Sequence, residues 1–166
     1  MTDFLFQSLE ELGETLEKTD ILSLTLSELE EEILKLGEKK FRAKQIFKWL
    51  HVKKVRSFDE MTDLSLELRT KLAVRFCLNQ LIIVRKLESC IDNTVKYLYE
   101  LSDGGHIETV LMEYSYGMSL CVSTQVGCKM GCNFCASTIA GFVRNLKPSE
   151  ILNQVYETER LSLIHI

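Results

Sequence analysis

In the first half of the chain, apolar residues recur every three or four positions, which is the period of an amphipathic α-helix. Thr25, with Glu28 three residues later, has the signature of a capping box, and Gly37 suits the position just after a helix end. A second apolar face surrounds Ile46 at the same spacing. The pattern predicts helices over residues 1–22, 25–36, 41–51 and 63–75.

Beyond Cys77 the period shortens to about two residues, which is typical of β-strands. The Asp-Gly-Gly run at 103–105 is a strong turn signal between two such stretches. The pattern predicts strands over residues 81–84, 94–101, 106–113 and 118–123. Pro148 suits the first turn of a final helix, whose apolar side would consist of Ile151, Leu152 and Val155.

The two halves together predict an α/β fold with a domain boundary between residues 77 and 92, where the period changes. Residues 1–80 would form a helical accessory domain, and residues 81–166 would form a second unit. A chain of 166 residues can hold one ordinary domain, or a small domain and part of another. No run approaches the roughly 20 apolar residues that a membrane span requires, so we expect no membrane association.

The net charge of −4 hides a strong segregation of charge along the sequence. Residues 1–38 carry eleven acidic and two basic side chains, whereas residues 39–56 carry eight basic side chains and no acidic one. Such a basic stretch can be the solvated face of an ordinary helix. It can also contact RNA phosphates, with aromatic support from Phe41 and Trp49 and a continuation over residues 53–56. We call its helical part the basic ridge: Lys40, Arg42, Lys44 and Lys48.

Three cysteines lie close together with the spacing C-x3-C-x2-C: Cys128, Cys132 and Cys135. Iron–sulfur clusters are usually held by four cysteines, and a metal with an open position can do chemistry. Zinc would require a fourth ligand, and the three histidines form no second ligand pair. Six cysteines in 166 residues are too few for a disulfide scaffold. The spacing favours an iron–sulfur cluster in a reducing compartment, with zinc and structural thiols as alternatives.

Several blocks of sequence around these cysteines resemble the RlmN family of radical S-adenosylmethionine (SAM) enzymes, which methylate C2 of adenine in 23S rRNA and tRNA. The cysteine spacing alone indicates only the radical SAM superfamily, whereas the blocks and their order indicate the family. The resemblance extends over residues 20–157. Its blocks are residues 39–51, 107–110, 121–128, 132–138 and 141–146.

The resemblance implies a [4Fe–4S] cluster held by Cys128, Cys132 and Cys135, with SAM as the second cofactor at the open iron. Glu108 matches the proton acceptor of the family. Cys121 matches a cysteine that assists release of a covalent protein–RNA adduct. The resemblance also implies 23S rRNA and tRNA as partners, an external electron donor, a cytoplasmic monomer and a disulfide bond.

The family continues well beyond the length of this chain, so the resemblance implies an N-terminal portion. Its fold would be a helical domain, a small antiparallel sheet and the first strand–loop–helix unit of a partial (β/α)6 barrel. The SAM-binding Gly-Glu-Pro block and the methyl-carrying cysteine of the family have no match here, so we expect the chain alone not to complete methyl transfer. The alternatives are an adenine-C8 methyltransferase and a non-catalytic RNA-binding module.

Overall fold

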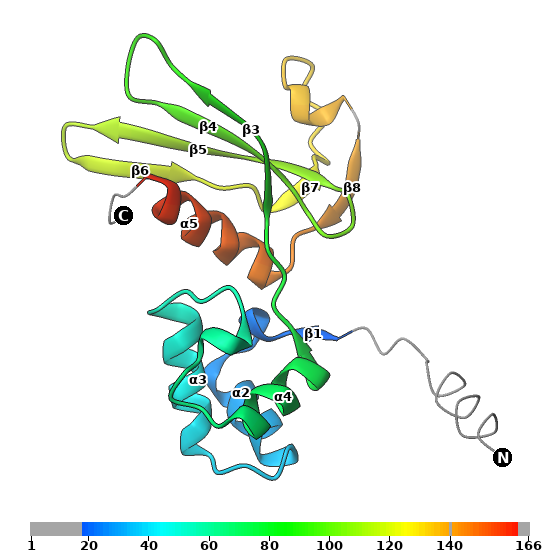
Figure 1. The fold of residues 1–166 in the computed structure, drawn as a ribbon. Coiled ribbons are helices and arrows are strands. Elements are labelled where there is room, and N and C mark those ends of the chain that lie inside the picture. Colours follow the sequence, from blue (N-terminus) through cyan, green and yellow to red (C-terminus); the bar gives the residue numbers. More distant parts are fainter. Residues whose placement is uncertain (1–17, 140, 163–166) are drawn as a thin grey trace, which may run out of the picture.

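The computed structural model describes residues 18–139 and 141–162, and the predicted helical stretch over residues 1–17 lies outside these ranges. In Figure 1 the lower part of the molecule is helical and the upper part is mainly β-sheet. Within the described ranges, no helix is long and apolar enough to cross a membrane. The helical part consists of β1 (Thr19–Asp20), η1 (Ile21–Ser23), α2 (Leu26–Lys35), α3 (Phe41–His51), η2 (Phe58–Glu60), α4 (Leu66–Arg75) and β2 (Phe76–Cys77).

Local sequence signals place the first two long helices as predicted. The Thr25 hydroxyl accepts a hydrogen bond from the Glu28 backbone N–H at 3.4 Å, and the Glu28 carboxylate accepts one from the Thr25 N–H at 2.8 Å. Gly37 follows α2 with a φ of +76°, the left-handed conformation that ends many helices. The apolar faces of α2, α3 and α4 meet in one core, which includes Ile33, Ile46, Leu50, Leu68 and Leu72.

Two boundaries in the helical part differ from the sequence-based prediction. Residues 18–22 are not α-helical, because β1 pairs in parallel with β2 at the end of α4. The Asp20 carboxylate then accepts a hydrogen bond from the Leu22 N–H at 3.1 Å and starts the short η1 turn. The helix predicted from Asp63 begins after Ser65, whose hydroxyl caps the first turn of α4.

The upper part contains an antiparallel sheet whose strands follow sequence order: β3 (Ile82–Glu88), β4 (Val95–Glu100), β5 (His106–Tyr114) and β6 (Gly117–Cys121). The four predicted strands are confirmed, and β3 is an exposed edge strand. A second antiparallel pair was not predicted: β7 (Gln125–Gly127) and β8 (Phe142–Asn145). Each of these strands is too short to show a period in the sequence.

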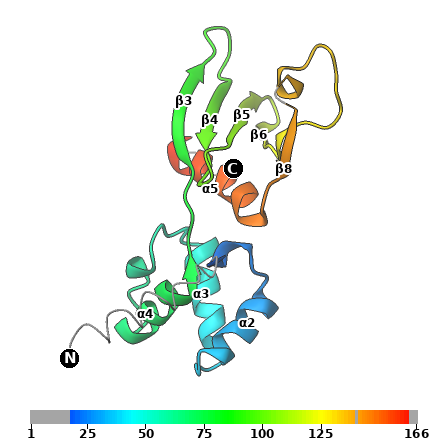
Figure 2. The ribbon, with the colours of Figure 1, turned by 90° about the vertical axis from the view of Figure 1, so that its right-hand side faces the viewer.

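The final helix, α5 (Pro148–Ser162), lies between the sheet and the helical part in both views (Figure 1 and Figure 2). The predicted apolar side is only half-buried: Leu152 packs against the helical core and Ile151 against the sheet core. Because α5 is flanked by two cores, the helix face between them is enclosed and makes polar contacts. Its buried residues are Ser149, Glu150, Asn153, Gln154, Glu157 and Thr158.

Polar contacts also join α5 to the end of α3. His51 Nδ1 lies 2.8 Å from the Tyr156 hydroxyl, and Lys54 forms an ion pair with Glu159. Burial lowers the pKa of His51, because the charged imidazolium would lose its hydration. The buried Nε2 of this ring has no hydrogen-bond partner among the described residues, so a proton there would be unsatisfied.

We expect the fold to lose stability as the pH falls through about 6.5, because the unfolded chain then takes up a proton that folded His51 resists. Urea unfolding at about pH 7.5 and about pH 5.5 measures this loss, and His51→Gln should reduce it. His106 is exposed and serves as the matched control, so His106→Gln should keep the original pH dependence. An identical pH dependence in both variants would contradict the role assigned to His51.

Candidate functional site

One face of the four-stranded sheet is covered by α5, and the opposite face is open (Figure 1). Burial alternates along β5, where Ile107 and Thr109 are buried and Glu108 is exposed. Val110 is two residues from Glu108 and pairs with Cys121 on β6. Side chains two residues apart, and side chains of directly paired residues, lie on the same face of a sheet. Glu108 and Cys121 therefore share the open face.

Glu108 has a charged partner on this face. The Lys96 ammonium on β4 lies 2.9 Å from the Glu108 carboxylate, and the two side chains are 41% and 52% exposed. The Ser123 hydroxyl donates a hydrogen bond to the Glu108 carbonyl oxygen at 2.7 Å, which ties β5 to the segment after β6. Cys121 is an exposed free thiol. The open face thus presents a carboxylate, an ammonium group and a thiol from three neighbouring strands.

The three closely spaced cysteines lie on the single loop that joins β7 to β8. The loop narrows to a neck where its two ends meet. A Cβ atom on Gly127 would lie 1.8 Å from the Gly141 carbonyl oxygen, and the φ of Gly127 is +71°. A side chain at this position would therefore be both strained and blocked, so the neck requires glycine.

Hydrogen bonds order the second half of this loop. The Thr138 hydroxyl lies 3.1 Å from the Cys132 carbonyl oxygen and 2.7 Å from that of Cys135. The Cys135 N–H donates to the Cys132 carbonyl oxygen at 3.1 Å, and the short turn η3 (Ala136–Thr138) follows. Near the first cysteine, the Met130 N–H lies 3.5 Å from the Cys128 sulfur. The backbone between the second and third cysteines is thereby held in a defined turn.

The chemistry of this loop fits an iron–sulfur cluster, because it offers three half-buried free thiols. The site is not preassembled: within the described part of the chain, no three His, Cys, Asp or Glu side chains are grouped closely enough to hold a metal ion. The disulfide bond implied by the resemblance is not formed either, since all six cysteines are free. The structure therefore brings the three cysteines onto one loop without bringing their sulfur atoms together.

Gln154 on α5 links the strands that carry Glu108 and Cys121. Its side-chain oxygen accepts hydrogen bonds from the Thr109 hydroxyl and the Ser123 N–H, both at 2.8 Å. Its side-chain nitrogen donates to the Ser123 carbonyl oxygen at 2.9 Å and to that of Glu150 at 3.3 Å. The amide is fully buried, and all four of its hydrogen-bonding positions are used. Sequence reasoning missed this residue, because its partners Thr109 and Ser123 lie 45 and 31 positions away.

Arg144 on β8 anchors the other end of the cysteine loop. Its guanidinium donates two hydrogen bonds to Glu150 on α5, both at 2.8 Å, and one to Asp103 at 2.7 Å. Burial alone would raise the pKa of Glu150, but Arg144 and the Lys147 N–H outweigh it and hold that pKa below its usual value. Arg144 also lowers the pKa of Asp103. The cysteine loop is thus tied to α5 and to the β4–β5 turn.

The basic ridge runs along α3 as predicted, but its members differ in their partners. Lys40 pairs with Glu30 at 2.9 Å, and Arg42 donates to the side chain of Gln45 at 2.8 Å. The two remaining members, Lys44 and Lys48, are exposed and make no hydrogen bond or ion pair with any described residue. Their positive charges are therefore uncompensated.

The residues expected to extend this surface have structural partners instead. Trp49 is buried in the helical core, and its indole N–H donates to Asp63 at 2.5 Å. Arg56 approaches Glu157 on α5 to 3.8 Å, and Lys54 forms its ion pair with the same helix. Of the two aromatic residues, Phe41 is exposed and Trp49 is not. The free basic surface is therefore smaller than the sequence suggested.

The architecture matches that of a known enzyme class. A radical SAM methyltransferase from Sphaerobacter thermophilus, known from its crystal structure, superposes with a TM-score of 0.79 at 41% sequence identity. The match covers 87% of this chain and 42% of that protein. The chain therefore has the fold of part of a radical SAM methyltransferase.

Sequence comparisons define the family more closely. Residues 19–78 match the family described as "Ribosomal RNA large subunit methyltransferase N-terminal domain". The "Probable dual-specificity RNA methyltransferase RlmN" of Lachnoclostridium phytofermentans is 58% identical over 149 residues, which is 88% of this chain and 41% of the relative. The protein of the same name from Alkaliphilus oremlandii is 54% identical over 140 residues, or 84% and 40% of the two lengths. The chain belongs to the RlmN family and corresponds to an N-terminal portion of its members.

Replacing Gln154 by leucine should lower the free energy of unfolding by about 3 kcal/mol, because the buried Thr109 hydroxyl and the half-buried backbone groups of Ser123 lose their partner. Gln125→Leu is the matched control. It removes a single exposed hydrogen bond of 3.2 Å to Asn145, and it should cost less than about 1 kcal/mol. Urea unfolding of both variants measures the difference. Equal stability of the two variants would show that the buried amide does not hold the strands together.

Proposed function

We propose that the protein of which this chain forms the N-terminal portion methylates C2 of adenine in 23S rRNA, and also acts on tRNA. The chain spans about 40% of the length of the relatives it matches, so the activity is that of the longer protein. The observation that supports it most is the shared open face of Glu108 and Cys121, on the sheet that leads into the three-cysteine loop. The relatives' name, which describes an RNA methyltransferase, supports the choice of substrate.

In this proposal Cys128, Cys132 and Cys135 hold a [4Fe–4S] cluster, and SAM is the second cofactor. The cluster with bound SAM supplies one-electron chemistry, which a carbon that is neither acidic nor nucleophilic requires. The protein's own groups act on the open face. When methyl replaces hydrogen at C2, the ring loses a proton, and Glu108 accepts it.

Neighbouring groups support these roles. Lys96 orients the Glu108 carboxylate through the 2.9 Å ion pair. The Cys121 thiol assists release of the covalent adduct between protein and RNA, and its exposure on the open face leaves it accessible. Gln154 fixes the segment after Cys121 relative to the strand of Glu108.

Further parts of the proposal concern the partners. Residues 1–80 serve as an accessory unit that contacts RNA, chiefly through Lys44 and Lys48, whose charges are uncompensated. The proposal includes an external electron donor, which would reduce the cluster, and an enzyme that works as a monomer in the cytoplasm. Methylation at C8 of adenine is the alternative reaction, and a non-catalytic RNA-binding module is the alternative class.

The reaction can be tested in a chimera that joins this chain to the remaining portion of the Lachnoclostridium phytofermentans relative. Expressed in a host without its own enzyme, the chimera should produce 2-methyladenosine in 23S rRNA, measured by nucleoside mass spectrometry. Glu108→Gln should lower the yield by about 10² to 10⁴-fold, and Cys121→Ala should leave a protein–RNA adduct visible on denaturing gels. Cys90→Ala is the control and should retain activity, because Cys90 is an exposed cysteine in the turn between β3 and β4 and does not line the pocket around Glu108.

The outcome also separates the alternatives. A product of 8-methyladenosine without 2-methyladenosine would refute the C2 assignment. Normal activity in Glu108→Gln would refute its role as the proton acceptor. RNA binding without any methylated product would favour the non-catalytic module.

The RNA-binding role of the basic ridge can be tested in the chain itself. Neutralising Lys44 and Lys48 together to glutamine should weaken binding to an RNA hairpin, and reduce the slope of log affinity against log salt by about 1.4 to 1.8. Lys35 and Lys71 lie in the same helical part but are paired with glutamates, so their double replacement is the control. Equal effects of the two double variants would show that the ridge is only a solvated face.

A further inference from the structure

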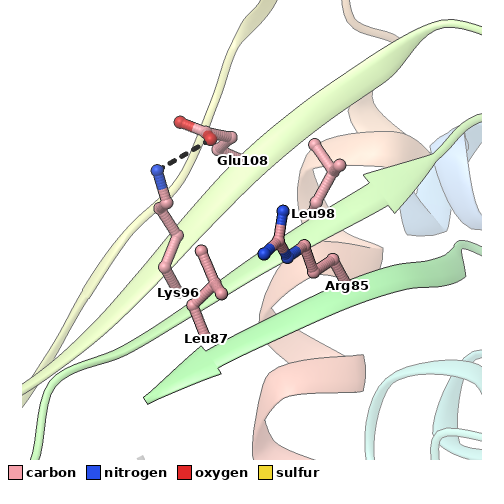
Figure 3. A pocket seen from close by; sticks show the side chains of 5 residues that line it. All are labelled: Arg85, Leu87, Lys96, Leu98 and Glu108. Atoms are coloured by element: carbon pink, nitrogen blue, oxygen red, sulfur yellow. Dashed lines mark ion pairs between the residues drawn. The ribbon is translucent and has the colours of Figure 1, made fainter. Parts of the chain in front are cut away.

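A second basic site lies on the open face of the sheet, away from the basic ridge. A shallow pocket of about 220 Å³ is lined by residues of three adjacent strands, as Figure 3 shows. The pairing register places Arg85 opposite Leu98, and Leu98 opposite Glu108. Its lining residues are Arg85 and Leu87 on β3, Lys96 and Leu98 on β4, and Glu108 on β5.

The charges in this pocket do not cancel. Lys96 is paired with Glu108 at 2.9 Å, so these two charges compensate each other. Arg85 is exposed and makes no hydrogen bond or ion pair with any described residue, and its guanidinium points over the pocket (Figure 3). The next residue, Lys86, is on the same edge strand but is paired with Glu88 at 2.5 Å. The one uncompensated positive charge of the pocket therefore belongs to Arg85.

The floor of the pocket is aliphatic. In the pairing register, Leu87, which is 43% exposed, is opposite Lys96, and the half-buried Leu98 is between Arg85 and Glu108. A guanidinium beside an exposed apolar surface suits a nucleotide of a single strand: the planar fork of donors binds a phosphate, and the apolar surface contacts the base or ribose.

We infer that Arg85 binds a phosphate of the RNA strand next to the target adenosine, while the floor formed by Leu87 and Leu98 contacts the adjoining nucleotide. The inference rests on the proposed function, because Glu108 lines the same pocket and would act on the target base. An RNA strand that brings an adenine to Glu108 crosses the open face of the sheet beside Glu108. The free guanidinium of Arg85 on β3 is the cation that this RNA strand meets there.

The test is the binding of a single-stranded RNA of about twelve nucleotides to the full chain, measured by fluorescence anisotropy at several salt concentrations. Arg85→Gln should weaken binding about five- to tenfold, and reduce the salt slope by about 0.7, the value for one lost phosphate contact. Lys86→Gln is the matched control, because it removes one positive charge from the adjacent position. It should change the affinity less than about twofold.

Three outcomes would overturn the inference: equal affinities of Arg85→Gln and Lys86→Gln, no measurable binding by the unmodified chain, or an acidic peptide that binds as tightly as RNA with the same dependence on Arg85. Because Arg85 has no partner among the described residues, its replacement should leave the thermal unfolding temperature unchanged. The chimera's methylation assay keeps this result separate from the proposed reaction. If Arg85→Gln binds RNA and forms 2-methyladenosine as the unsubstituted chimera does, only the phosphate contact is refuted. If the unsubstituted chimera forms no 2-methyladenosine, the proposed reaction is refuted.

Discussion

The buried side-chain amide of Gln154 is the contact on which the arrangement of the candidate site most depends. It lies on the helix that separates the two cores, and it binds both the strand of Glu108 and the segment that follows Cys121. A buried amide that makes all of its hydrogen bonds fixes the direction of each partner, whereas apolar packing tolerates small shifts of the packed groups. The position of β5 relative to the segment between β6 and β7 is therefore fixed by a group that contributes no chemistry to the proposed reaction.

Sequence periodicity located the elements that bury one face against one core, and this explains both its success and its failures. α3 has a single apolar face, and its predicted ends agree with the structure. α5 begins at Pro148 as predicted, but it is flanked by two cores, so its predicted apolar side is only half-buried and its buried residues are polar. The family resemblance drew attention to Glu108 and Cys121, but only the strand register places them on one face. Gln154 and Arg144 act largely through contacts with other strands and turns, which leave no local pattern in the sequence.

The two faces of the sheet have separate tasks. α5 covers one face of the antiparallel sheet, and Glu108 lies on the opposite, open face. Exposed basic groups without a carboxylate partner among the described residues include Lys44 and Lys48 on α3, and Arg85 on the edge strand. This separation suits an elongated polyanion better than a compact anion, because one strand can meet both surfaces.

The glycine neck of the cysteine loop has an entropic consequence. Folding of β7 against β8 already brings the loop ends together at Gly127 and Gly141, so the entropy of closing the loop is lost before any metal arrives. When the three thiols bind a cluster, only the interior of the cysteine loop then has to become ordered. The fold thereby raises the effective concentration of each thiol near the others, and the sulfur atoms remain free to move into position.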